Sequence, residues 1–196
     1  ATNPEAPPLR VAVIGYSFMG RIHTQAWLTA GRFFDLGTRV EVAAVCGRDA
    51  TAAAEFAERF GIPRVFTDWR DVVADPGIDV VDICTPGDTH AEIAIAALDA
   101  GTHVLCEKPL CMTSAQIEEL CAVRDRTGKH FEEAFAFRNH PQWTKVREIL
   151  ASDALGPVRA VHGMLAKQFF DPRDIRNNPA EGGGSMYDLG SYAVCA

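Results

Sequence analysis

The feature that most constrains this chain is a regular alternation of short apolar runs with segments of helical spacing. Strand-like runs lie at 9–15, 39–47, 64–67, 79–85, 102–109 and 131–137, and those at 9–15, 39–47 and 79–85 are rich in β-branched residues. Strands that alternate with helices of this length imply right-handed βαβ units and a parallel sheet. The central runs are apolar on both faces, as a sheet covered on both sides requires. The sequence therefore predicts an α/β fold with a doubly wound, Rossmann-type sheet.

Local signals place the ends of the predicted helices. Thr89–Glu92 and Thr113–Gln116 both have the spacing of a capping box, in which the Thr hydroxyl and the later acid or amide satisfy free N–H groups. Gly61, Gly101 and Gly128 follow expected helix ends, where a left-handed residue closes a helix.

The pattern changes near residue 138. A helix is expected at 141–151, and the long, half-alternating run 158–169 is predicted as the first strand of a second, open sheet. That strand has no partner in the chain, and a long unpaired strand is a liability, so we expect the C-terminal domain to be incomplete. The predicted organisation is a flexible arm at 1–10, a dinucleotide-binding domain at 11–138, and the beginning of a substrate or oligomerisation domain at 139–196.

Composition restricts the partners. The formal net charge of −7 argues against a nucleic-acid surface, which needs clustered Lys and Arg. No apolar run approaches the ~18 residues of a membrane span, so no membrane partner is expected. Six cysteines without a CxxC pair are typical of reduced thiols, which predicts a cytoplasmic protein. No His, Cys or Asp cluster has metal-ligand spacing, and no metal is predicted.

The turn after the first apolar run reads "GYSFMG" and resembles a dinucleotide loop. In the usual G-x-G-x-x-G pattern the second glycine allows close approach of a pyrophosphate, and Ser17 stands at that position here. The turn opens the first helix, whose N-terminus favours an anion. The alternative is a plain tight turn. The predicted cofactor contacts in this turn are Gly15, Tyr16, Ser17, Phe18, Met19 and Gly20.

The end of the second apolar run, "CGRD", bears on the choice of cofactor. An acid there would bind the 2′-hydroxyl of NAD, but the tip offers Arg48, which suits a 2′-phosphate. NADP is therefore favoured, with NAD as the alternative. In the opposing reading Arg48 is solvated and Asp49 only caps the next helix.

The stretch "HVLCEKPL" and the closing "GGGSMYDLGSY" carry a resemblance to a known family. With the Gly15–Gly20 turn, Thr85-Pro86 and Arg138–Pro141, the chain resembles the glucose–fructose oxidoreductase/inositol dehydrogenase/MocA family along essentially its whole length. The resemblance implies a Rossmann domain followed by a C-terminal α/β domain whose open sheet often forms homo-oligomers. It also implies NAD(P)-dependent oxidation or reduction of sugars, polyols or diols. The expected partners are therefore small molecules.

The resemblance also implies catalytic roles for Lys108, Asp188 and Tyr192. Tyr192 stands where many members have His. In the branch with xylose and dihydrodiol dehydrogenases, Tyr takes the place of this His. Tyr192 would exchange the proton of the substrate hydroxyl, and Lys108 would lower the Tyr192 pKa. Asp188, one helical turn earlier, would orient Lys108 or a hydroxyl. The alternatives are that Tyr192 only packs and that Asp188 is a structural helix residue.

Other residues complete the predicted site. Further cofactor contacts are expected at Thr85, Pro86, His90, Glu107 and Lys108. Substrate contacts are expected at Lys108, Arg138, Arg176, Asp188 and Tyr192. His23 and His90 also suit local packing or capping. The favoured function is an aldose-type dehydrogenase. The alternatives are an inositol-like dehydrogenase using NAD, a non-catalytic nucleotide-binding regulator, and an inactive fragment.

Overall fold

The computed structural model describes residues 6–168 and 171–195. The chain divides into a first compact unit that ends at Glu133 and a second that begins at Ala134. Of the predicted arm at 1–10, the first five residues lie outside the described part. Each unit is described by itself below.

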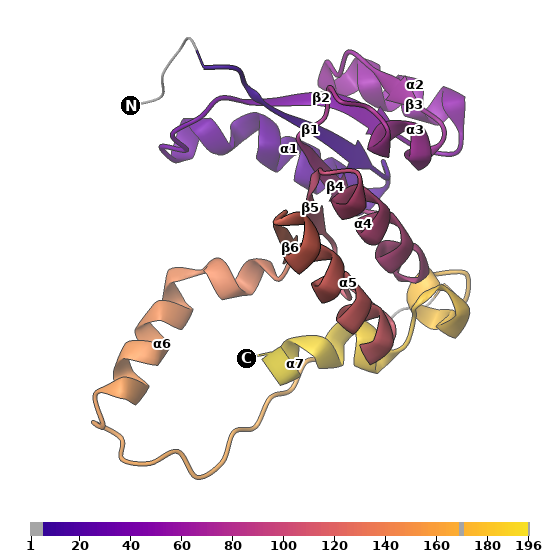
Figure 1. The fold of residues 1–196 in the computed structure, drawn as a ribbon. Coiled ribbons are helices and arrows are strands. Elements are labelled where there is room, and N and C mark those ends of the chain that lie inside the picture. The colour runs from indigo at the N-terminus through magenta and orange to yellow at the C-terminus, as the bar shows by residue number, and fades with distance from the viewer. Residues whose placement is uncertain (1–5, 169–170, 196) are drawn as a thin grey trace. The chain divides into compact units, whose positions relative to one another are not determined.

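The first unit contains a six-stranded parallel sheet in the order β3-β2-β1-β4-β5-β6 (Figure 1). Its strands are β1 (Leu9–Ile14), β2 (Val40–Cys46), β3 (Val65–Phe66), β4 (Val80–Ile83), β5 (His103–Cys106) and β6 (Phe131–Glu133). The order reverses at β1, whose neighbours are β2 and β4. This confirms the predicted doubly wound Rossmann-type fold.

Helices cover both faces of the sheet. They are α1 (Phe18–Phe33), α2 (Ala50–Phe60), α3 (Trp69–Val73), α4 (His90–Asp99) and α5 (Ser114–Thr127). One core joins strand residues such as Ala12 and Ile83 to α4 and α5, and a second joins Val13 and Val45 to α1 and α2. Successive residues of β1 thus enter opposite cores, because side chains of a strand alternate between the two faces.

The helix-end predictions had mixed outcomes. Thr113 and Gln116 form the predicted capping box, and Gly61 and Gly128 close α2 and α5 in the left-handed conformation. The box at Thr89 was wrong: its hydroxyl donates to the carbonyl of Pro86 instead of capping α4. The reason is the 3₁₀ turn Gly87–Thr89, which runs into α4 and leaves no extended N-cap at that position.

The regular elements among the described residues of the second unit are all helices or helical turns. They are the 3₁₀ turns Ala136–Asn139, Ile175–Asn177 and Pro179–Glu181, α6 (Pro141–Ala151), the π-turn Met186–Gly190 and α7 (Ser191–Cys195). The strand predicted at 131–137 is shorter than expected, because β6 ends at Glu133 and a 3₁₀ turn follows at Ala136–Asn139.

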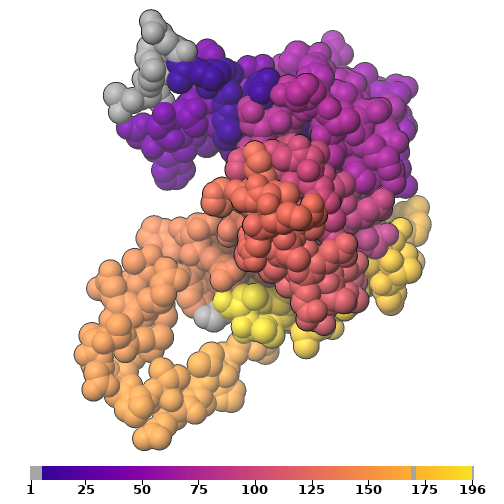
Figure 2. All heavy atoms as spheres, in the orientation of Figure 1, coloured from indigo at the N-terminus to yellow at the C-terminus, as the bar shows by residue number. Residues whose placement is uncertain are grey.

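The predicted strand at 158–169 was wrong in its described part. Residues 158–168 form no helix or strand, and all are exposed, including Val161 and Met164. Figure 2 shows this stretch (orange) as a narrow chain of atoms. A strand exists only through hydrogen bonds to a neighbouring strand, and no described residue of the second unit supplies one. Residue 169 lies outside the described part.

No helix within 6–168 and 171–195 is long and apolar enough to cross a membrane.

Candidate active site

Most of the predicted cofactor contacts lie where β1, β4 and β5 end. These strands are parallel neighbours, so the turns that leave them meet at one edge of the sheet. In open α/β sheets this carboxyl edge, at the point where strand order reverses, is the ligand-binding position. The geometry of each turn shows what it can hold.

Two positions in the turn after β1 require glycine. Gly15 has φ +105°, and a Cβ there would lie 2.6 Å from the carbonyl oxygen of Cys84. A Cβ on Gly20 would overlap the carbonyl oxygen of Gly15. The first glycine permits the turn, and the second lets α1 pack closely against it. Both are backbone features that a dinucleotide turn needs.

The N-terminus of α1 points its free N–H groups toward the same edge. Ser17 is the N-cap residue, yet its hydroxyl makes no capping hydrogen bond. Ser17 is exposed, so its hydroxyl adds a donor beside the backbone N–H groups. These donors and the Gly15–Gly20 turn fit a pyrophosphate, which such a helix end binds through hydrogen bonds and the helix dipole.

The end of β2 is shaped by Tyr16. Its ring lies against Gly47, where an added Cβ would overlap the ring, and it packs toward Phe56 at a centroid distance of 6.4 Å. Arg48 is exposed beside this contact, and Asp49 accepts the N–H groups of Thr51 and Ala52. The predicted capping role of Asp49 is confirmed, and Arg48 is the charged side chain left at this tip.

The turn after β4 is fixed by His90. Its ring is buried, with Nδ1 2.8 Å from the carbonyl oxygen of Pro109 and Nε2 2.8 Å from that of Thr85. The hydroxyls of Thr85 and Thr89 lie 2.7 Å apart. His90 thus holds the turns after β4 and β5 together from behind, whereas Thr85 and Pro86 lie half-buried in the turn itself.

Lys108 follows β5 in a segment held on both sides. Its backbone N–H donates to Oε2 of Glu107 at 3.1 Å, and the N–H of Leu110 donates to Oε1 of Glu133 at 2.8 Å. The Lys108–Pro109 peptide bond is cis. Lys108 is half-buried at the edge where the glycine turn lies.

The structure contains a buried ionic network that sequence reasoning missed. Nδ1 of His23 lies 2.9 and 3.0 Å from the two carboxylate oxygens of Asp82, and Nε2 lies 3.0 Å from Oε1 of Glu107. Asp82 is fully buried on β4 and also accepts Nε1 of Trp27 at 2.7 Å. We expected local packing or capping from His23. The available signal was Asp82, an acid in the middle of an otherwise apolar run.

The charge of this network follows from its contacts. Burial lowers the pKa of His23, but hydrogen bonds to Asp82, Cys84 and Glu107 and the charge of Asp82 outweigh burial and raise it to about 12. Burial also raises the pKa of the Cys84 thiol to about 12. At neutral pH His23 is therefore an imidazolium that contacts Asp82 and Glu107, beside a neutral Cys84 thiol.

His23, Asp82 and Cys84 bring three donor atoms of metal-ligand type within 4.8 Å of one another. Sequence spacing gave no sign of this group, because its members come from α1 and β4. Hydrogen bonds explain why these side chains lie close together, since the Asp82 carboxylate already binds His23 and Trp27.

Tyr192 lies in α7 of the second unit, in an aromatic setting. Its ring packs edge-on against Phe135 at a centroid distance of 5.3 Å and tilted against Phe137 at 5.7 Å. These contacts fix the direction of the ring. Tyr192 is only half-buried, so packing does not enclose the whole side chain.

Asp188 lies in the π-turn that precedes α7. Its Oδ2 is 3.5 Å from Nε of Arg176, which also hydrogen-bonds Asp174. The structure thus joins Asp188 to Arg176, a pairing that the sequence did not suggest. A π-turn is rare and occurs frequently at functional sites. Arg138 is exposed in a 3₁₀ turn.

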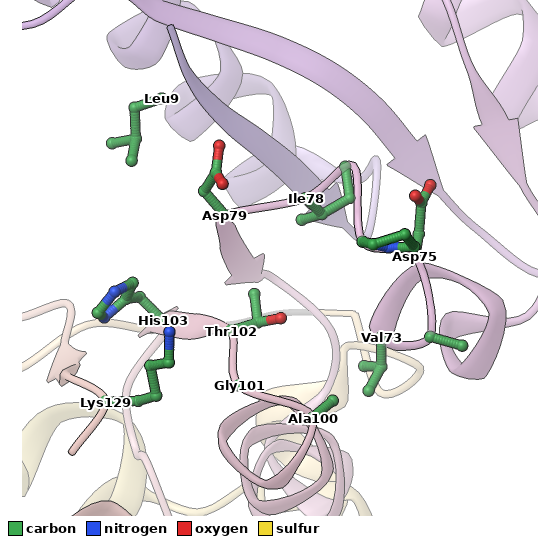
Figure 3. A pocket seen from close by; sticks show the side chains of 12 residues that line it. Leu9, Val73, Asp75, Ile78, Asp79, Ala100, Gly101, Thr102, His103 and Lys129 are labelled. Carbon is green, nitrogen blue, oxygen red and sulfur yellow. The ribbon is translucent and has the colours of Figure 1, made fainter. Parts of the chain in front are cut away.

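A hollow of about 480 Å³ lies at the opposite, amino edge of the sheet (Figure 3). It is lined where β1, β4 and β5 begin, by residues that include Leu9, Asp79, His103 and Lys129. None of the predicted cofactor or catalytic residues lines it. Its position at the amino ends of the strands argues against a nucleotide site, since such sites use the carboxyl ends.

The fold and the glycine turn together define a protein of the dinucleotide-binding class. Residues 9–135 match the oxidoreductase family model GFO_IDH_MocA, described as an NAD-binding Rossmann fold, and residues 143–196 match the GFO/IDH/MocA C-terminal domain. The chain belongs to this family, as the resemblance predicted.

Relatives give the family context. The chain is 39% identical over 160 residues to D-xylose 1-dehydrogenase (NADP(+)) 2 of Haloferax volcanii, an alignment that covers 80% of this chain and 48% of the relative. An oxidoreductase domain protein of Kribbella flavida matches with TM-score 0.86 and 38% identity, over 97% of this chain and 53% of that one. Levoglucosan dehydrogenase in complex with NADH matches with TM-score 0.85 and 30% identity, over 96% and 52%. The chain thus spans about half the length of the curated relatives it matches.

Proposed function

We propose that this chain supplies the cofactor-binding unit and part of the catalytic set of an NAD(P)-dependent dehydrogenase. The reaction is oxidation of a CH–OH group of a sugar, polyol or diol, or the reverse reduction. The observation that carries the proposal is the convergence of the Gly15–Gly20 turn and Lys108 at one carboxyl edge of the sheet. Relatives that are named as sugar dehydrogenases support the substrate class.

The cofactor is assigned to the carboxyl edge. The backbone N–H groups of the Gly15–Gly20 turn and the Ser17 hydroxyl would hold the pyrophosphate. Thr85, Pro86, Glu107 and Lys108, in the turns after β4 and β5, would supply the further cofactor contacts. When bound, the nicotinamide accepts or donates the hydride. His90 contributes by holding the turns after β4 and β5 from behind.

We assign transfer of the substrate hydroxyl proton to Tyr192, assisted by Lys108. As the substrate C–H bond breaks, the hydroxyl O–H proton passes to the phenolate oxygen of Tyr192, and the C–O bond becomes a carbonyl. An unperturbed Tyr has a pKa of about 10, so a nearby ammonium is needed to favour the phenolate. Lys108 supplies that charge and hydrogen-bonds the substrate oxygen. Asp188, with Arg176 and Arg138, binds the remaining hydroxyl groups of the substrate.

NADP is proposed as the preferred cofactor. No acid lies at the end of β2, and Arg48 is exposed there to meet a 2′-phosphate. The relatives include a xylose dehydrogenase named for NADP+ and a levoglucosan dehydrogenase in complex with NADH. The six free cysteines fit the reducing cytoplasm that the sequence predicts.

The deciding experiment is a panel of aldoses, inositols and diols, each assayed with NAD and with NADP. We expect turnover of an aldose with NADP. Lys108→Ala and Tyr192→Phe should each lower kcat by about 10²-fold or more while cofactor still binds, because each removes a group that acts in proton transfer. Cofactor binding is measured separately by fluorescence titration.

Tyr187→Phe is the matched control, since it removes a phenol hydroxyl from the neighbouring π-turn without touching the proposed proton path. Its turnover should equal that of the parent protein. Unchanged turnover in Tyr192→Phe would sink the mechanism. Turnover of inositols with NAD alone would overturn the aldose assignment.

A further inference from the structure

The segment Glu107-Lys108-Pro109 is held by two histidines from different helices. His23 of α1 contacts Oε1 of Glu107 at 3.0 Å, and His90 of α4 contacts the carbonyl oxygen of Pro109 at 2.8 Å. These two residues flank Lys108 in the sequence. Both contacts lie behind the carboxyl edge, within the first unit, so neither ring needs to touch a ligand to influence Lys108.

The contact at Glu107 extends to the backbone of Lys108. Glu107 uses one carboxylate oxygen for His23 and the other for the Lys108 N–H, at 3.1 Å. The carboxylate is thus fixed at both ends. Because Glu107 is buried, the loss of either contact would leave part of its carboxylate without a hydrogen-bond partner and with little access to water.

His23 is itself fixed by the sheet. Its other ring nitrogen binds both oxygens of Asp82, which lies fully buried in β4 and also accepts the Trp27 indole N–H. The groups that face His23 are Asp82, Glu107 and the Cys84 thiol. An imidazolium is the only cation among them, so its charge compensates two carboxylates in a low-dielectric position. The sheet interior is thereby linked to the backbone of Lys108.

His90 holds the other end. Its ring is buried and binds the carbonyl oxygens of Thr85 and Pro109, both at 2.8 Å. It therefore ties the residue after Lys108 to the turn that follows β4.

We propose that His23 and His90 are positioning residues that clamp Glu107 and Pro109 and thereby aim Lys108 at the reacting centre. We call these two contacts the histidine clamp. The catalytic role of Lys108 rests on the proposed function, whereas the contacts of the clamp are independent of the cofactor. Removal of the groups that orient metal-ligating residues typically changes activity about 10- to 100-fold, and we expect an effect of the same size for Lys108.

The test compares His23→Gln and His90→Gln with Trp27→Phe. Trp27→Phe is the matched control, because it removes a hydrogen bond to the same Asp82 carboxylate and leaves the His23–Glu107 contact in place. Hydrogen exchange of the Lys108 amide is followed by NMR together with the amides of β1. The cofactor Kd, kcat and KM are measured on the same proteins.

We expect His23→Gln to speed Lys108 amide exchange about 10-fold relative to β1 amides, because the Glu107 acceptor loosens. It should lower kcat about 10- to 100-fold and change the cofactor Kd little. His90→Gln should lower kcat in the same way. Trp27→Phe should lower the unfolding midpoint but leave Lys108 exchange and kcat unchanged. The clamp is overturned if Trp27→Phe speeds Lys108 amide exchange as much as His23→Gln does, or if His23→Gln does not speed it at all.

A second measurement covers the case in which His23→Gln fails to fold. In the parent protein with ¹⁵N-labelled histidine, both ring nitrogens of His23 should remain protonated from pH 6 to 9. A His23 that loses a proton near the ordinary value of about 6.5 overturns the ionic bridge. If Lys108→Ala retains full turnover, the proposed function fails while the exchange and titration results still decide the clamp.

Discussion

The amino and carboxyl edges of the parallel sheet differ in the groups that they present to a ligand, and the volume of the hollow at the amino edge does not reflect this difference. The amino edge has a hollow of about 480 Å³, bordered by Asp79, His103 and Lys129. Its ionic contacts, such as that of Arg10 with Asp79, are partly exposed. The carboxyl edge has a glycine turn, a helix N-terminus and Lys108, supported by a buried ionic network.

The difference shows why we base the proposed cofactor site on chain direction rather than on cavity volume. All six strands are parallel, so free N–H groups of helix N-termini gather near one edge and carbonyl groups of helix ends near the other. An anionic cofactor is favoured only at the first. The following predictions test that asymmetry.

The largest effect is expected in the glycine turn. Gly20→Ala should lower the free energy of unfolding by about 3 kcal/mol and abolish cofactor binding, because its Cβ would overlap the Gly15 carbonyl. Gly31→Ala in the same helix is the control, since nothing lies within 4 Å of an added Cβ. It should raise stability by about 0.5–1 kcal/mol. Urea unfolding and cofactor titration measure both, and a neutral Gly20→Ala would contradict the close-packed turn.

The buried network should come next. Asp82→Asn leaves the His23 imidazolium without its main counter-charge, so we expect a loss of about 3–5 kcal/mol in the free energy of unfolding. Asp79→Asn at the amino edge removes a partly exposed partner of Arg10 and should cost about 1 kcal/mol or less. Equal losses in urea unfolding would show that the two edges do not differ in this respect.

Arg48 sharpens the comparison at the cofactor itself. Arg48→Ser should weaken NADP binding about 10- to 100-fold, because a charge-assisted hydrogen bond to the 2′-phosphate is lost. NAD binding should stay nearly unchanged. Fluorescence titration with each cofactor measures the ratio, and a parallel loss for both would remove Arg48 from the ribose site.

The smallest effects are expected at the amino edge. Lys129→Ala should change the cofactor Kd less than about twofold, because it lies at the opposite ends of the strands. A large change would place binding in the hollow.

His103 adds a modest pH dependence at the same edge. Burial, with the charge of Lys129, lowers the pKa of His103. The unfolded chain therefore binds a proton more readily, and stability is present above the unfolded pKa of about 6.5 and lost as pH falls below it. Between pH 7.5 and 5.5, the thermal unfolding midpoint should fall less steeply in His103→Gln than in the parent protein. A steeper fall would contradict the sign.

Local signals predicted most of the first unit. The apolar runs gave the strands, and Thr113 capped α5 as expected because the chain enters that helix from an extended residue. Thr89 failed for the opposite reason, since a 3₁₀ turn precedes α4. Residues 158–168 had strand-like alternation, but pairing depends on a partner elsewhere, which the pattern cannot supply.

The ionic network could not be predicted from spacing. His23 lies 59 positions from Asp82 and 84 from Glu107, and only the sheet order brings them together. The glycine turn was predicted because its residues are adjacent in the sequence. The catalytic assignments of Lys108 and Tyr192 came from resemblance and remain predictions.

The contact of Tyr16 with Gly47 has a consequence for changing cofactor preference. An acid that selects NAD is usually placed at the tip of the second strand, but any side chain at position 47 would displace the Tyr16 ring. Tyr16 belongs to the phosphate turn, so a change meant for the ribose end would also disturb the pyrophosphate end. A substitution at position 47, unlike one at Arg48, would therefore need a compensating change at Tyr16.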